Sequence, residues 1–296
     1  MGKKLIVVLL ILAGLAAAGV WTYWRYEATK PITLFPGETS NVIAPRETAP
    51  LSGISDAKPV AIAPPGGNST NSGVVGFQPR SGETLDFSAN VPKLNSVVAN
   101  LRVKVGERKS VAGKDAWHLQ AFAHTENPYR MVFELDDEFD SYSDSSNLTS
   151  LKYEMHLNER GQKVDTVERM TSSSREPAPA NEVAARVLPG TRDPIGMLMF
   201  LRGVDWNTTK EVKSPVFDGH KLYDVRAVLA GKGQNISLAA GKYSTTKIEI
   251  HVMDNGAEMK DAHFLLYLAD GPERLPVLME AVLPVATARV ELVKVR

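Results

Sequence analysis

Residues 151–157 read LKYEMHL, so that apolar side chains at positions 151, 153, 155 and 157 alternate with charged or polar ones. A period of two places successive side chains on opposite faces of a β-strand. The next four residues, 158–161, read NERG, a polar stretch ending in glycine that predicts a tight turn into another strand. This part of the chain therefore predicts a hairpin with one buried face and one solvent-facing face.

The same alternation recurs along most of the chain beyond Arg80. It predicts strands over residues 85–91, 101–105, 117–123, 151–157, 223–229, 248–252, 264–268, 277–283 and 288–292. By the same rule we expect Met131, Phe133 and Leu135 to face a core. The glycines of residues 231–233 and of the Gly241-Lys242 pair are typical of hairpin turns. About ten successive strands with short turns predict a mainly β, antiparallel domain.

Helical signal is concentrated in residues 193–203. Asp193 is a suitable N-cap, Pro194 suits the first helical position, and the following residues are mostly apolar as far as Gly203. One short helix among many strands favours a curled antiparallel sheet, either a half-barrel that clasps the helix or a closed barrel. An immunoglobulin-like sandwich is the second choice, because the paired cysteines of that fold are missing.

The N-terminus predicts a membrane segment. Residues 5–24 carry no charge, two lysines precede them, and aromatic side chains cluster at their end. About 20 apolar residues suffice to cross a bilayer, so residues 1–28 predict a signal-anchor helix of a single-pass inner-membrane protein. Small residues before Gly19 also fit a cleavage site near Ala18, which would release a secreted or periplasmic protein. Both interpretations place residues 31–296 outside the cytoplasm.

Residues 29–79 differ in composition from the segments on both sides. They are rich in proline, glycine, serine and threonine, which disfavours helices and central strands. We expect a disordered linker that extends the folded part away from the membrane, with an edge strand at residues 74–77 as the alternative. The predicted organisation is an anchor over 1–28, this linker over 29–79 and a β-rich extracytoplasmic domain over 80–296.

Composition excludes several functions. The 34 basic and 34 acidic residues give no net charge, and no basic stripe is visible, so we expect no nucleic-acid partner. The absence of cysteine excludes disulfides, thiolate metal ligands and thiol redox chemistry. No phosphate-binding glycine motif and no Gly-x-Ser-x-Gly motif is present, and the serines at 172–174 lie in a polar stretch typical of a loop. We therefore expect no cofactor and no catalytic residue.

Histidines and carboxylates were considered as metal ligands. His118, His156 and His251 fall on the polar faces of predicted strands, without a local metal-binding spacing such as H-E-x-x-H. Solvated surface histidines are the favoured interpretation, although a site that combines different strands stays open. The acidic run over residues 134–144 lacks the glycine and terminal glutamate of a calcium-binding loop. A solvated strand end is favoured there, and no metal site is predicted.

Several short segments together resemble a known family. In order, they are SGETLDF at 81–87, DDEFDSY at 136–142, DPIGMLMFLR at 193–202, AAGKY at 239–243, YLAD at 267–270 and LPV at 275–277. This series resembles the exported bacterial family called domain of unknown function 3108, from Ser81 onward. Phe87 stands where a tyrosine is usual, and Tyr267 where a tryptophan is usual. The resemblance implies a β-rich envelope domain and transfers no catalytic residue.

Two classes of function remain, and a structural spacer is a third. The favoured class is a non-catalytic binding or assembly module whose concave sheet holds a lipid, a glycan or a partner protein. Its ligand-cavity candidates are Met197, Phe200 and Leu201 on the helix and Trp117, Tyr153 and Tyr267 on strands. The alternative is a hydrolase of an envelope polymer that uses Glu134 or Asp137 with a histidine from another strand.

Overall fold

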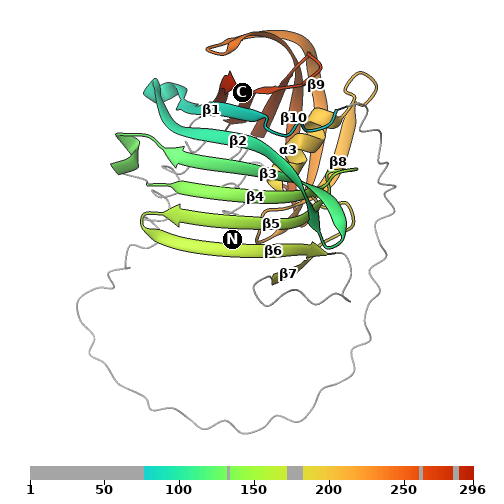
Figure 1. Cartoon of the computed structure of the whole chain (residues 1–296). Coiled ribbons are helices and arrows are strands. Elements are labelled where there is room, and N and C mark those ends of the chain that lie inside the picture. Colours follow the sequence, from blue (N-terminus) through green and yellow to red (C-terminus); the bar gives the residue numbers. More distant parts are fainter. Residues whose placement is uncertain (1–76, 132–133, 172–182, 260–262, 283–286) are drawn as a thin grey trace, which may run out of the picture.

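A computed structural model describes residues 77–131, 134–171, 183–259, 263–282 and 287–296. Strands dominate these residues, with one α-helix and two 3-10 turns among them (Figure 1). The elements are β1 (Thr84–Val91), η1 (Pro92–Leu94), β2 (Ser96–Val111), β3 (Lys114–Thr125), η2 (Tyr129–Met131), β4 (Asp136–Asp144), β5 (Ser150–Glu159), β6 (Gln162–Thr171), β7 (Val183–Arg186), α3 (Pro194–Gly203), β8 (Glu211–Phe217), β9 (Leu222–Leu238), β10 (Gly241–Asp254), β11 (Ala257–Glu258), β12 (His263–Ala269), β13 (Pro276–Val282) and β14 (Thr287–Val295).

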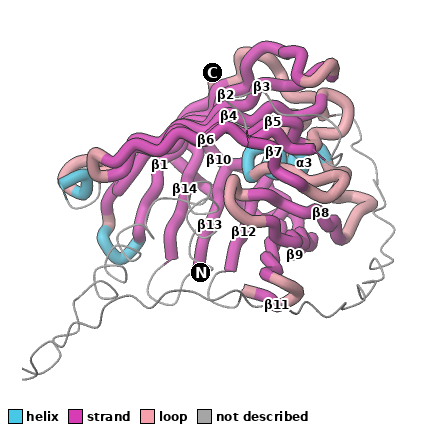
Figure 2. The backbone as a smooth tube through the Cα atoms, turned by 90° about the horizontal axis from the view of Figure 1, so that it is seen from below, coloured by secondary structure: helices cyan, strands magenta, loops and turns pink. Residues whose placement is uncertain are grey.

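All these strands belong to one sheet with the order β7-β6-β5-β4-β3-β2-β1-β14-β13-β12-β10-β9-β8, and β11 pairs with β10. Neighbours are antiparallel except for β6 and β7, which are parallel. The order has two ends, so the sheet is not closed. Its two halves face each other with α3 between them (Figure 2). After β7 the chain reaches the opposite edge of the sheet, where Arg192 forms a parallel bridge with Val216 of β8.

The core fills the concave side of the curled sheet. Alternate strand residues point inward, as in β1, where Leu85, Phe87, Ala89 and Val91 are buried and the residues between them are half-buried. All ten residues of α3 are buried, which accounts for a helix that is apolar on most of its surface. The helix therefore occupies the interior that the two halves of the sheet enclose.

The structure confirms the predicted fold class and corrects three details. The sheet is a curled, unclosed half-barrel that clasps one helix at 194–203, rather than a closed barrel or a sandwich. Leu135 is buried as predicted, but Met131 lies in η2 with 87% of its surface exposed. Residues 231–233 do not form a turn, because β9 continues to Leu238 and the hairpin turn falls just before Gly241. The structure also has more than about ten strands, since β4, β7, β8 and β11 were not predicted, and the acidic run taken as a solvated strand end lies within β4 with Asp137 and Asp140 buried.

Several predictions lie outside the described residues. They include the anchor over 1–28, residues 29–76 of the linker, Phe133 and the serines at 172–174. Among the residues that are described, no helix has the length and apolar character needed to cross a membrane. Phe77, near the end of the predicted linker, is buried, and the Arg202 guanidinium lies 4.5 Å from its ring centroid.

Candidate binding cleft around helix α3

The N-terminus of α3 is attached to β4 and β5 through Asp193. One carboxylate oxygen accepts hydrogen bonds from the backbone N–H groups of Ile195 and Gly196, at 2.9 and 2.8 Å. The other oxygen accepts from the hydroxyl groups of Ser141, at 2.5 Å, and Ser150. Burial raises the pKa of Asp193, and these four hydrogen bonds oppose that shift by stabilising the carboxylate. The result is a capped helix end with a fixed position on the sheet.

Gly196 lets the helix approach the sheet closely at this end. A Cβ atom at this position would lie 2.8 Å from Ser143 Oγ and 3.1 Å from Ser150 Oγ. Any larger residue would push α3 away from β4 and β5. The local sequence Asp193-Pro194-Ile195-Gly196 thus combines a cap, a helix start and a close contact.

The C-terminus of α3 is held by two arginines. Arg202 is fully buried and forms a bidentate ion pair with Glu83, with Nη to Oε distances of 2.7 and 2.8 Å. Arg202 Nη2 also donates to the carbonyl oxygen of Glu273 at 3.0 Å. Arg274 donates from Nη1 to the last carbonyl groups of the helix, including that of Val204 at 2.6 Å. Cations at this end complement the helix dipole, so both ends of α3 are held by polar contacts.

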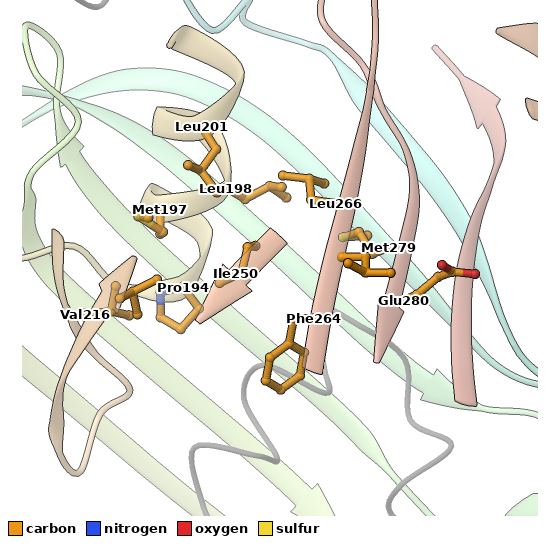
Figure 3. Close-up of a pocket in the computed structure, with 12 residues that line it drawn as sticks. Pro194, Met197, Leu198, Leu201, Val216, Ile250, Phe264, Leu266, Met279 and Glu280 are labelled. Carbon is orange, nitrogen blue, oxygen red and sulfur yellow. The ribbon is translucent and has the colours of Figure 1, made fainter. Parts of the chain in front are cut away.

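An apolar cleft lies between α3 and strands β8 to β13 (Figure 3). Four lining residues come from the helix and the others from the strands: Pro194, Met197, Leu198, Leu201, Val216, Val225, Ile250, Phe264, Leu265, Leu266, Met279 and Glu280. All of them except Glu280 are apolar. The lining therefore favours an apolar ligand over one that needs many hydrogen bonds.

The cleft is small in this conformation. Its volume is about 60 Å³, whereas pockets for drug-sized ligands measure roughly 300–1,000 Å³. It admits a short apolar group and not a whole amphiphile. Met197 and Met279 lie on opposite walls, and their unbranched thioether side chains can repack around a guest more easily than branched side chains. A ligand would therefore be held by dispersion contacts and by the removal of apolar surface from water.

The six predicted cavity residues divide between the cleft and other parts of the core. Met197 and Leu201 line the cleft. The other four are buried but are not among its lining residues: Phe200, Trp117, Tyr153 and Tyr267. The Arg192 guanidinium lies 3.7 Å from the ring centroid of Phe200, and the Tyr267 hydroxyl donates to the lining residue Glu280 at 3.1 Å.

None of the strand residues that line the cleft was predicted as a cavity residue. Ile250, Phe264, Leu266 and Met279 all lie within predicted strands, so their alternation is visible in the sequence. What the sequence does not show is that β10, β12 and β13 are neighbours that face the helix. Val216 was missed for another reason, because Pro215 obscures the short edge strand β8.

The acids of the predicted hydrolase alternative have other partners. Glu134 forms an ion pair with Arg130 at 2.7 Å. Asp137 is buried, accepts the backbone N–H of Asn158 at 2.9 Å, and has its pKa raised to about 7 by burial. Among the described contacts, histidines pair with other carboxylates, as His118 does with Asp140. The hydrolase alternative gains no support from these contacts.

The fold and the cleft define a class of protein in which a curled, unclosed antiparallel sheet encloses one buried helix beside a small apolar cleft. The chain belongs to the family described as "Protein of unknown function (DUF3108)", whose model matches residues 88–293. This confirms the family resemblance seen in the sequence. No curated protein matches the chain.

The solved structures that match this chain have low sequence identity to it and low TM-scores. One is a "beta-barrel-like protein of domain of unknown function DUF1849" from Brucella abortus, with 12% identity, a TM-score of 0.46, and coverage of 73% of this chain and 97% of that one. Another is a chain from Parabacteroides distasonis named provisionally as a lipoprotein, with 12% identity, a TM-score of 0.35, and coverage of 74% and 97%. At TM-scores below 0.5 these similarities indicate nothing about function.

Proposed function

We propose that this protein is a non-catalytic cell-envelope module that binds the apolar end of a lipid in the cleft beside α3. The observation that supports this proposal is the lining, in which eleven of the twelve residues are apolar. The uncharged residues 5–24 support a position at the outer surface of the cytoplasmic membrane, where lipids are the abundant apolar molecules. Cleavage near Ala18 would place the same module free in the periplasm.

The lining favours a lipid over a glycan. Sugar hydroxyls enter a buried site at a cost of several kcal/mol unless each finds a hydrogen-bond partner, and Glu280 is the one polar residue among the lining residues. An acyl group needs no such partner, and each buried methylene contributes about 0.8 kcal/mol. The small volume indicates that the end of the chain is bound rather than the whole lipid.

Binding is tested with a fluorescent fatty acid and a variant that fills the cleft. Met279→Trp adds bulk to the lining, whereas Val97→Trp adds the same residue type at an exposed position of β2. We expect saturable binding to the native protein, a loss of at least about tenfold in affinity in Met279→Trp, and native affinity in Val97→Trp. A loss of about tenfold corresponds to roughly 1.4 kcal/mol, which two methylene contacts supply. Urea unfolding of both variants verifies that they are folded.

Two results would contradict the proposal. One is the absence of saturable binding to the native protein, and the other is equal binding by the two tryptophan variants. The location is tested separately by cell fractionation and external protease digestion. Recovery of the full-length chain in the membrane fraction, digested only from outside, supports the anchored form, and a soluble product that begins after Ala18 supports the cleaved form.

A further inference from the structure

A compact group of metal-ligand residues lies on the outer face of β4 and β5, away from the α3 cleft. Asp140 and Glu154 are directly opposite each other in the antiparallel register of these strands, and His156 follows Glu154 on the same face. One ligand atom from each of the three residues lies within 4.8 Å of the other two. Two ligands on opposite sides of one ion at bonds of about 2.0–2.4 Å are separated by no more than this.

Residues around this group orient each of its three members. Asp140 Oδ1 accepts hydrogen bonds from His118 Nε2 at 2.5 Å and from Gln120 Nε2 at 3.0 Å. The Lys152 ammonium lies 2.5 Å from Glu154 Oε1. The two carboxylates are thereby held by neighbours on β3 and β5, and His156 is held by Asp165 on β6, which limits the side-chain entropy that binding an ion would cost.

His156 gives a more specific indication. Its Nδ1 lies 2.7 Å from Asp165 Oδ1 on β6, and an ionised carboxylate only accepts, so Nδ1 carries the donated proton. In neutral His156, Nε2 then presents a lone pair, and this atom faces Glu154 Oε2 at 3.6 Å. Two acceptors at this separation leave room for a cation between them, either a proton on Nε2 or a metal ion. A carboxylate on the far nitrogen is also the usual partner of a metal-ligating histidine.

The distances fit a metal ion. Two ligands of a tetrahedral zinc ion with bonds of about 2.0–2.2 Å lie about 3.3–3.6 Å apart, and the separation of His156 Nε2 from Glu154 Oε2 is 3.6 Å. Two carboxylates offset most of the charge of a divalent ion, and Lys152 pairs with Oε1 of Glu154 while Oε2 faces His156. One imidazole combined with carboxylates suits zinc and related transition metals better than calcium or magnesium, which prefer oxygen ligands alone.

We propose that Asp140, Glu154 and His156 bind a divalent transition-metal ion, with zinc as the reference ion, on the outer face of the sheet. Three protein ligands leave one tetrahedral position for water or for a group from a partner. The side chain of His156 is 38% exposed, so an ion can reach the site from solvent. The site lies on the opposite face from the cleft and does not depend on lipid binding.

The test is isothermal titration of the chelator-treated full-length protein with zinc chloride. We expect one strongly bound ion per chain, and a loss of affinity of at least about 100-fold in Glu154→Gln and in His156→Gln. Asp165→Ala keeps the three ligands but removes the partner of Nδ1, and it is expected to weaken binding by about 10–100-fold. His124→Gln removes a histidine that also pairs with an aspartate on β4 but is not in the group, so it serves as the matched control.

Substitution of cobalt for zinc gives a second measurement. Visible absorption bands of bound Co²⁺ are expected in the native protein and in His124→Gln, and are expected to be absent in His156→Gln. The proposal is wrong if zinc does not bind to the native protein. It is also wrong if zinc binds equally to His156→Gln, or if binding is lost instead in His251→Gln, which removes the pairs of His251 with Glu249 of β10 and Glu258 of β11. The substituted side chains are exposed or half-buried, and thermal unfolding verifies that each variant is folded.

Discussion

The buried ion pair between Glu83 and Arg202 makes a strong prediction about the stability of the fold. Arg202 is 0% exposed and Glu83 4% exposed, so neither side chain has water to replace a lost partner. Glu83→Gln keeps the shape of the side chain but leaves the guanidinium without a balancing charge. Removing one partner of a buried pair costs about 3–5 kcal/mol. For a domain of about 150–250 residues, each kcal/mol lowers the melting temperature by about 2–4 °C, which gives a fall of roughly 6–20 °C.

The assay is urea unfolding followed by tryptophan fluorescence. Trp206 is a suitable reporter because its indole N–H donates to the carbonyl oxygen of Leu201, within α3, at 3.0 Å. The double variant Glu83→Met with Arg202→Met removes both charges together, and we expect it to be closer in stability to the native protein than Glu83→Gln is. The reasoning is refuted if Glu83→Gln lowers the free energy of unfolding by less than about 1 kcal/mol, or if the double variant is the less stable one.

Two further predictions concern the region where α3 meets β4 and β5, and a third concerns the buried Asp137 of β4. Asp193→Ala removes the helix cap and the acceptor of two buried serine hydroxyls, and we expect a loss of about 2 kcal/mol or more in urea unfolding. Gly196→Ala should destabilise by about 1–3 kcal/mol in spite of the better helix propensity of alanine, and adding Ser143→Ala should recover part of this loss; a stabilised single variant would contradict the close contact. Burial raises the pKa of Asp137 to about 7, while the unfolded chain ionises near pH 4, so the unfolded state binds fewer protons between these values. Stability is therefore expected to fall as the pH rises from about 4 to 7, and Asp137→Asn should flatten this part of the measured curve.

Sequence reasoning succeeded where one face of a strand is buried. Phe87, Leu101 and Tyr153 all sit at the apolar positions of alternating segments and all are at most 2% exposed. It failed where strands extend beyond the core. The outer parts of β9 and β10 are paired with each other in the structure, but their side chains are mostly exposed or half-buried and show no apolar alternation. Backbone hydrogen bonds hold this hairpin together, and they leave no mark on the pattern of side chains.

The error at Met131 has a related cause. The prediction that Met131, Phe133 and Leu135 face the core assumes that residues 131–135 form a single strand. The chain instead leaves β3, passes through η2 and returns at the isolated bridge of Leu135 with Glu159. Alternation relates the faces of two residues only within one continuous strand, and Met131 lies in η2, outside any strand.

The cleft shows the limit of reasoning about sites. A strand's alternation identifies which side chains point inward, but register and strand order decide which inward side chains meet. Trp117 and Leu266 are both buried and inward, yet Trp117 lies on β3 near Arg108, and Leu266 lies on β12 at the cleft. The helix candidates divide in the same way, because a central helix directs side chains to every side: Met197 and Leu201 line the cleft, whereas Phe200 lies against Arg192.

Strand β4 contributes residues both to the attachment of α3 and to the proposed metal site. Its acidic run does not form one patch, because alternation sends Asp137 inward and Asp140 outward. The inward Ser141 holds the cap of α3, and the outward Asp140 belongs to the proposed metal group. Because neighbouring residues of one strand serve opposite faces, a shift of register between β4 and β5 would separate Asp140 from Glu154 and move Ser141 away from Asp193 at the same time. The proposed zinc site and the hydrogen bonds that position α3 on the sheet thus require the same pairing of β4 with β5.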